Sequence, residues 1–150
     1  MQNIRITKIF HFEMAHALDN YDGLCRNIHG HSYKLHVTLI GQPSSDETSP
    51  KKGMLIDFSD LKKIVQKSII DKYDHALVLN QNTDKRILDT LKQHYQKIIT
   101  IPFQPTSELL LISFADILKN NLPANVKLYG LRINETDTSY AEWFAGDNEG

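Results

Sequence analysis

The sequence has one cysteine, Cys25, almost no net charge and no long hydrophobic run. A single cysteine cannot form a disulfide within the chain, so a reducing compartment, the cytoplasm, is expected. No apolar stretch approaches the roughly 20 residues of a membrane-spanning helix, and the first residues lack the pattern of a signal peptide. The formal net charge of −1 provides no basic excess for nucleic acid or anionic lipid. Neither a membrane nor a nucleic-acid partner is expected.

What is present is ordinary for a folded protein. The 150 residues are 41% hydrophobic and 23% charged, which is enough apolar material for a real core. This length and composition predict a single domain over residues 1–150.

The segment 25–31, with sequence CRNIHGH, places two histidines two residues apart just before a strand-like stretch. Alternate residues of a strand point to the same face, so His29 and His31 can aim at one point. Gly30 allows close approach to the backbone between them. Two such histidines and a third from elsewhere form a common zinc triad with an open fourth position. The pair alone is more often a surface or packing feature.

A third histidine can reach this pair through strand pairing. Residues 4–13 and 33–41 alternate and are rich in β-branched and aromatic side chains, which predicts an antiparallel hairpin. This pairing carries His16, just past the first strand, toward the histidines of the second. His11 competes, but its parity is opposite to that of the neighbouring phenylalanines, so it is expected to face solvent.

The rest of the chain alternates between helical and extended patterns. The expected elements are a short strand at 53–58, a helix capped by Asp57 or Ser59, a shorter helix at 83–93, a strand at 98–101, a helix begun by Thr106, and strands at 126–135 and 140–144. Phe58, Leu61 and Val65 mark the buried stripe of the first helix. Hairpins with helices on one face predict an α+β fold with an antiparallel sheet.

Cys25 is a candidate for chemistry. A free thiol has a pKa of about 8.5, and a nearby zinc ion or protonated His75 would favour the thiolate as base or nucleophile. The alternatives are a small buried apolar side chain, or a fourth zinc ligand in a closed structural site.

The neighbouring Asp74 and His75 form a second candidate. His75 can relay protons with Cys25, or the pair can simply cap a helix end. Adjacent residues of a regular element face different ways, so Asp74 is expected to be free to orient a different group.

Two glutamates complete the set. Glu108 lies in the first turn of a helix, where the helix dipole favours a carboxylate in any case. Glu135 continues the apolar face of a strand and therefore needs a partner. The other members of that face are Tyr129, Leu131 and Ile133. The partner of Glu135 is either an arginine such as Arg132 or the two-donor edge of a pterin or guanine ring.

Six short motifs follow one another between Ile4 and Phe144. They are FxxAH ending at His16, CxxxHGH ending at His31, GMLIDFxxLK from Gly53, DH at 74–75 with LN at 79–80, PTSE at 105–108 and ET at 135–136. In this order they resemble the 6-pyruvoyl-tetrahydropterin synthase superfamily. The four-residue step from Cys25 to His29 is similar to its bacterial branch, 6-carboxy-5,6,7,8-tetrahydropterin synthase, which serves queuosine biosynthesis.

The resemblance implies a fold and an assembly. The fold is the tunnelling fold, an antiparallel sheet with helices on one face that assembles into an oligomeric barrel. Such proteins form homo-oligomers, trimers that stack into hexamers, with active sites at subunit interfaces.

The resemblance also implies roles. His16, His29 and His31 match the zinc ligands. Cys25 matches the catalytic proton acceptor, and His75 with Asp74 matches the relay. Glu135 matches the glutamate that anchors the pterin ring and is sometimes counted in the relay, and Glu108 matches a second ring-binding glutamate. Leu109, where the family often has Asn, and the long segment 81–104 depart from the pattern.

The implied reaction is the zinc-dependent conversion of 7,8-dihydroneopterin triphosphate to 6-carboxy-5,6,7,8-tetrahydropterin, with loss of triphosphate and acetaldehyde. A pyruvoyl-type synthase and a non-catalytic zinc- or pterin-binding module are the alternatives.

Overall fold

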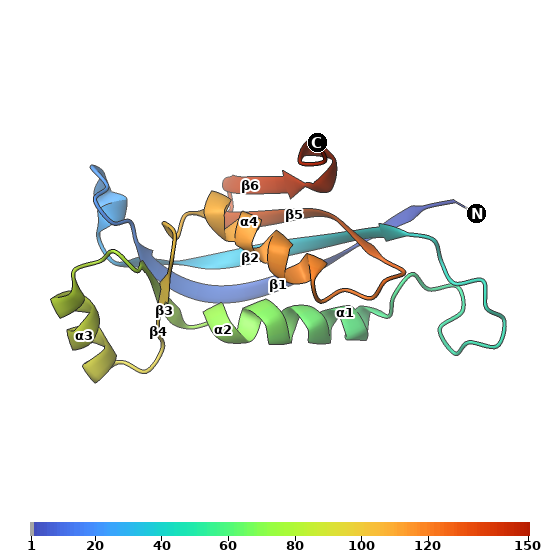
Figure 1. Ribbon diagram of the computed structural model, residues 1–150, viewed down its shortest axis with the longest axis horizontal. Helices are drawn as coiled ribbons and strands as arrows, with labels where there is room; N and C mark the ends of the chain where they lie inside the picture. Colours follow the sequence, from blue (N-terminus) through green and yellow to red (C-terminus); the bar gives the residue numbers. More distant parts are fainter. Residues whose placement is uncertain (1) are drawn as a thin grey trace.

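The computed structural model describes residues 2–150, which form one six-stranded sheet with helices packed on one face (Figure 1). The strands are β1 (Ile4–Ala17), β2 (His29–Gly41), β3 (Ala76–Asn80), β4 (Ile98–Ile101), β5 (Lys127–Thr136) and β6 (Ser139–Phe144). The helices are α1 (Phe58–Val65), α2 (Asp71–Tyr73), α3 (Lys85–His94) and α4 (Ser107–Lys119). A π-helical segment, Gln66–Ile70, joins α1 and α2 into one long helix. None of the helices in residues 2–150 has the length and apolar character to cross a membrane.

The strand order is β4-β3-β1-β2-β5-β6. Strands β1, β2, β5 and β6 pair antiparallel, which confirms the predicted α+β fold built from hairpins. Strands β3 and β4 add to the open side of β1 in parallel, with α3 as the crossover between them. Neither the strand at 76–80 nor the parallel pairs were predicted from the sequence. Figure 1 shows α3 at that end of the sheet, away from the other helices.

The β1–β2 hairpin is the longest pairing of the sheet. Its register runs without a break from Ile4 opposite Gly41 to His16 opposite His29. Alternate residues of β1 are buried, and His11 is exposed as predicted. The hairpin therefore delivers His16 beside the second strand's histidines, as the pattern predicted.

Aromatic side chains fill the space between the sheet and the helices. Tyr33 and Phe12, opposite each other on the hairpin, stack with ring centroids 5.1 Å apart. Phe114 from α4 packs edge-on against Phe12 at 6.4 Å, and Tyr73 from α2 packs against Phe114 at 5.2 Å. These rings pack α4 and α2 against the hairpin, directly beneath the histidines.

The predicted strand at 53–58 is wrong. Its backbone closes the preceding loop instead, because the Gly53 N–H donates to the Ser44 carbonyl and the Ser44 N–H donates to the Met54 carbonyl. Asp57 caps α1 as predicted, accepting a hydrogen bond from the Ser59 N–H. Phe58, predicted on the buried stripe, is 50% exposed, and burial of the helix begins one turn later.

A β-bulge corrects the expected face of β5. Thr38 pairs with Gly130 and Leu39 pairs with Leu128, so Tyr129 is an extra residue in its strand. The bulge reverses the alternation, and the Tyr129 ring lies outside the core against Phe144, at 5.8 Å. Tyr129 therefore does not share the buried face that ends at Glu135.

The packing of α1 in the core predicts how substitutions in this helix change the free energy of unfolding. Leu61 is fully buried, so Leu61→Ala should leave a cavity and lower the free energy of unfolding by about 2–5 kcal/mol. The control is Lys62→Ala on the exposed face, which should change it by less than about 0.5 kcal/mol. Denaturant unfolding measures both, and equal effects would contradict the packing described.

Candidate metal centre and active site

Three histidines converge where the hairpin opens. Nε2 of His16 lies 3.1 Å from Nε2 of His29, and the ring of His31 is 5.3 Å from that of His16 and 5.0 Å from that of His29. The alternation of β2 puts His29 and His31 on one face, and the hairpin register adds His16. The structure thus brings together the three histidines that the sequence predicts as ligands.

Backbone carbonyls orient two of the rings. Nδ1 of His16 lies 2.7 Å from the carbonyl oxygen of Pro105, and Nδ1 of His29 lies 2.7 Å from that of Asn27. A carbonyl only accepts, so each Nδ1 carries the proton and donates it. Each Nε2 then presents a lone pair to the centre. Two lone pairs facing each other at 3.1 Å require a cation or a proton between them, which fits a metal site.

Glu135 is the fourth member of the cluster. Its Oε1 lies 2.9 Å from Nε2 of His31 and 4.0 Å from Nε2 of His16. Ser107, a buried residue at the start of α4, donates a hydrogen bond of 2.7 Å to Oε2. Arg132, one of the partners considered for Glu135, instead lies 3.5 Å over the ring of Tyr140.

Two features of this carboxylate were not predicted from the sequence. One is the position of Glu135 beside the histidines, although the strand pattern put it on a core-facing position. The other is the role of Ser107, which lies in the PTSE motif. A small hydroxyl next to a predicted N-cap, together with a core-facing carboxylate that lacks a partner, is the signal that could have identified it.

The cluster has the composition of a metal site. One ligand atom from each of the four residues lies within 4.8 Å of the others. Within residues 2–150, the buried Nε2 of His31 makes no aligned hydrogen bond, although Oε1 of Glu135 lies only 2.9 Å away, so an ion would satisfy both atoms. Burial lowers the pKa of His16, which favours the neutral, ligating form. Three imidazoles suit a tetrahedral divalent ion, with one position left open beside the Glu135 carboxylate.

Cys25 lies beside this cluster rather than in it. It sits on a short 3-10 turn, Leu24–Arg26, between β1 and β2, and the Leu18 N–H holds the turn through the Cys25 carbonyl at 3.0 Å. Burial raises the pKa of the Tyr33 hydroxyl, and the nearby Glu135 and Cys25 side chains raise it further. Both side chains therefore lie close to this buried hydroxyl, whose ring packs edge-on against His31 at 5.5 Å.

Asp74 and His75 form a separate pair. Nδ1 of His75 lies 3.0 Å from Oδ1 of Asp74, so the expectation that these neighbours face apart is wrong. The reason is that they occupy a helix end, where His75 has a left-handed φ of 62°. The His75 side chain is 76% exposed, and within residues 2–150 its hydrogen-bond partner is Asp74 and not Cys25.

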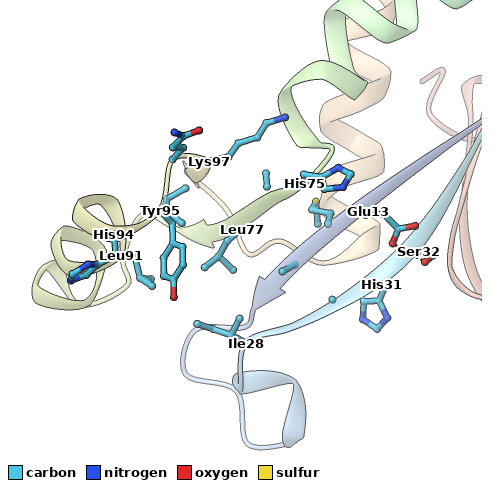
Figure 2. Close-up of a pocket in the computed structure, with 16 residues that line it drawn as sticks. Glu13, Ile28, His31, Ser32, His75, Leu77, Leu91, His94, Tyr95 and Lys97 are labelled. Atoms are coloured by element: carbon cyan, nitrogen blue, oxygen red, sulfur yellow. Dashed lines mark hydrogen bonds between the residues drawn. The ribbon is translucent and has the colours of Figure 1, made fainter.

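His31 and His75 both line an open pocket of about 1110 Å³ (Figure 2). Glu13 and Ser32 lie between them, with the Ser32 hydroxyl donating to the Glu13 carboxylate at 2.7 Å. The far wall comes from the end of α3 and the start of β4, including Tyr95 and other residues labelled in Figure 2. The predicted ring-binding residue Glu108 is exposed in the first turn of α4, outside the residues that line this pocket.

Comparison with known proteins gives consistent matches along the chain. A family model described as 6-pyruvoyl tetrahydropterin synthase matches residues 5–145. A Haemophilus influenzae protein named 6-carboxy-5,6,7,8-tetrahydropterin synthase is 39% identical over 141 residues, which cover 93% of this chain and 97% of that protein. A Rickettsia typhi protein of the same name is 29% identical over 142 residues, with 93% and 99% covered.

Solved structures agree in fold. The structure of Caenorhabditis elegans 6-pyruvoyl tetrahydropterin synthase superimposes with a TM-score of 0.66 at 26% identity and covers 97% of each chain. The Plasmodium vivax 6-pyruvoyl tetrahydropterin synthase structure gives a TM-score of 0.71 at 20% identity, with 95% of this chain and 98% of that chain covered. The second likeness is one of fold alone.

The geometry of the cluster predicts how variants will bind a metal ion. The wild-type chain should bind about one Zn²⁺ tightly, and His31→Ala should abolish tight binding because it removes a ligand. Ser107→Ala should weaken binding by roughly 10- to 100-fold, because Glu135 loses the hydrogen bond that orients it. His11→Ala on the opposite face is the matched control and should bind like wild type. Competition with a chromophoric chelator measures all four proteins, and tight binding by His31→Ala would contradict the site.

Proposed function

Since this chain belongs to the 6-pyruvoyl tetrahydropterin synthase family, we propose that it converts 7,8-dihydroneopterin triphosphate and one water molecule to 6-carboxy-5,6,7,8-tetrahydropterin, with release of triphosphate and acetaldehyde. The observation that carries the proposal is the convergence of three Nε2 atoms beside Cys25 and Glu135. The name and 39% identity of the Haemophilus influenzae relative support the carboxy product.

Zinc is the cofactor that we propose for the cluster. His16, His29 and His31 would hold it, and bound zinc would polarise the hydroxyl oxygens of the substrate side chain. The carbonyls of Pro105 and Asn27 keep two of these rings in the ligating tautomer whether or not substrate is present.

The remaining residues of the cluster handle the pterin ring and the proton. Glu135 accepts hydrogen bonds from the two-donor edge of the ring, and Ser107 fixes its Oε2 so that the carboxylate keeps one orientation. Cys25, on the turn beside the cluster, takes the proton released from the substrate side chain. Glu108 is a second ring contact, reached from the first turn of α4.

His75 relays this proton, with Asp74 orienting its ring. The pair faces solvent next to a pocket and has no hydrogen bond to Cys25 of the same chain, within residues 2–150. We therefore infer a homo-oligomer, a trimer or hexamer, in which His75 of one copy approaches Cys25 of a neighbour. A left-handed histidine at a helix end is the kind of strained position that functional sites retain.

The proposal has a setting and two rivals. The setting is the cytoplasm, where the product would supply 7-deazaguanine synthesis for queuosine. A pyruvoyl-type synthase would use the same residues without releasing acetaldehyde. A closed zinc module with Cys25 as fourth ligand is less favoured, because Cys25 is not among the described residues whose ligand atoms lie within 4.8 Å of one another.

The reaction is tested by incubating zinc-loaded protein with 7,8-dihydroneopterin triphosphate and identifying products by mass spectrometry. We expect 6-carboxytetrahydropterin, triphosphate and acetaldehyde. Cys25→Ala should keep its zinc and lose turnover by about 10²- to 10⁴-fold, because it lacks the proton acceptor. A pyruvoyl product would assign the chain to the rival branch, and no conversion would refute the proposal.

The shared site is tested by mixing impaired variants. Cys25→Ala and His75→Ala should each lose turnover by about 10²-fold or more alone, with a residual rate that can still be measured, yet mixed oligomers formed by co-expression should recover activity. Sites that take Cys25 from one copy and His75 from another would restore roughly a quarter of wild-type turnover in an equal mixture. Mixed oligomers that remain at the residual rate would place both residues of each site on one chain. A mixture of Cys25→Ala with itself under a second tag is the control.

A further inference from the structure

The peptide between Asp74 and His75 is held at its nitrogen end by β1. The His75 N–H donates to the Glu13 carbonyl at 2.6 Å. The Glu13 N–H donates in turn to Oδ1 of Asp74 at 2.9 Å. One residue of β1 thus binds both the backbone that carries His75 and the carboxylate that contacts its ring.

The same peptide is held at its oxygen end by Lys97. The Nζ atom of Lys97 donates to the carbonyl oxygen of Asp74, and also to that of Asp71 at 2.7 Å. Asp71 belongs to α2 and Asp74 is its C-cap, so both carbonyls lie at the helix end, where a cation is favoured by the helix dipole. Figure 2 shows the Lys97 side chain reaching back from the start of β4 toward this helix end.

Lys97 also holds the chain after His75. Its own carbonyl accepts a hydrogen bond of 3.0 Å from the Leu77 N–H, at the beginning of the parallel β3–β4 pairing. Lys97 therefore holds the chain on both sides of His75. Its side chain binds the Asp74 carbonyl, and its own carbonyl binds the N–H of Leu77.

His75 needs contacts on both sides because of its backbone conformation. A φ of 62° is disfavoured for a residue with a side chain and persists only where the surroundings determine it fully. Orientation of the Asp74–His75 peptide sets ψ of Asp74 and φ of His75, and hence the direction of the imidazole. Without a donor on its carbonyl, that peptide could rotate toward a relaxed conformation.

We propose that Lys97 is a positioning residue that fixes the direction of the His75 ring by binding the Asp74 carbonyl. The inference rests on the proposed role of His75 and assigns a purpose to the long segment 81–104 that contains Lys97. The crossover through α3 brings β4 alongside β3, and Lys97 at the start of β4 is placed within reach of the helix end.

Kinetics distinguish positioning from general stabilisation. Lys97→Met keeps the apolar stem and should lower kcat by about tenfold or more, with KM within about twofold, because the ring is misaligned but the metal cluster is intact. Lys97→Arg retains a cationic donor and should recover most of kcat. Lys92→Met, on the exposed side of α3, is the matched control and should behave as wild type.

A double-mutant comparison identifies His75 as the target. In a His75→Ala background, Lys97→Met should cause no further loss, because the group that it positions is gone. A full additional loss in that background, or an unchanged kcat in Lys97→Met itself, would overturn the proposal. Thermal unfolding identifies variants that fail to fold, and Lys97→Leu, which also lacks a donor, serves as the second variant with the same expectations.

A measurement without turnover separates this proposal from the proposed function. The ring Cε1–Hε1 signal of His75, assigned by its absence in His75→Ala, should shift or broaden in Lys97→Met and stay unchanged in Lys92→Met. If the wild-type chain proved inactive on the pterin substrate, this signal would still report the role of Lys97. An unchanged His75 signal in Lys97→Met would refute it.

Discussion

The register of the β1–β2 hairpin is the constraint on which the histidine cluster depends. It places His16 opposite His29 and puts His31 one alternation away on the same face. A slip of one residue would turn every side chain of a strand to the other face, and the cluster would disperse. The buried rings of Phe12 and Tyr33 oppose such a slip, because it would move them from the core to solvent. The same hairpin register is thus required both to pack the core and to bring the three histidines together.

Burial of polar groups at this point is offset by their mutual hydrogen bonds. His16 is almost fully buried, yet its Nδ1 meets the Pro105 carbonyl. The Glu135 carboxylate meets Ser107 on one oxygen and faces the histidines with the other. Pro105 and Ser107 flank the N-cap of α4, so the start of one helix supports two members of the cluster from behind. The buried Nε2 of His31, which makes no aligned hydrogen bond among the described residues, lies where it could bind an ion.

Sequence reasoning succeeded where a simple period governs the chain. Strand alternation predicted the three histidines and the exposure of His11, and helix signals predicted the caps at Asp57 and Thr106. It failed where one residue breaks the period. The bulge at Tyr129 reversed the alternation of β5, and the apolar run after Gly53 had no strand to pair with. The left-handed backbone of His75 could not be predicted either, because the Asp74–His75 peptide is held by Glu13 and Lys97, which are far from it along the chain.

The π-helical segment Gln66–Ile70 has a consequence for the orientation of the helix end. A π turn accommodates an extra residue without completing an extra turn, so everything that follows is rotated about the helix axis. Here the rotation lets the adjacent Ile69 and Ile70 both reach the core. It also sets the angle at which Asp74 leaves the helix toward Glu13. A chain shortened by one residue in this segment could regain a regular α-helix and a good core, yet present its acid–histidine pair in another direction. The direction in which Asp74 and His75 point therefore depends partly on the π-helical segment, which precedes them in the chain.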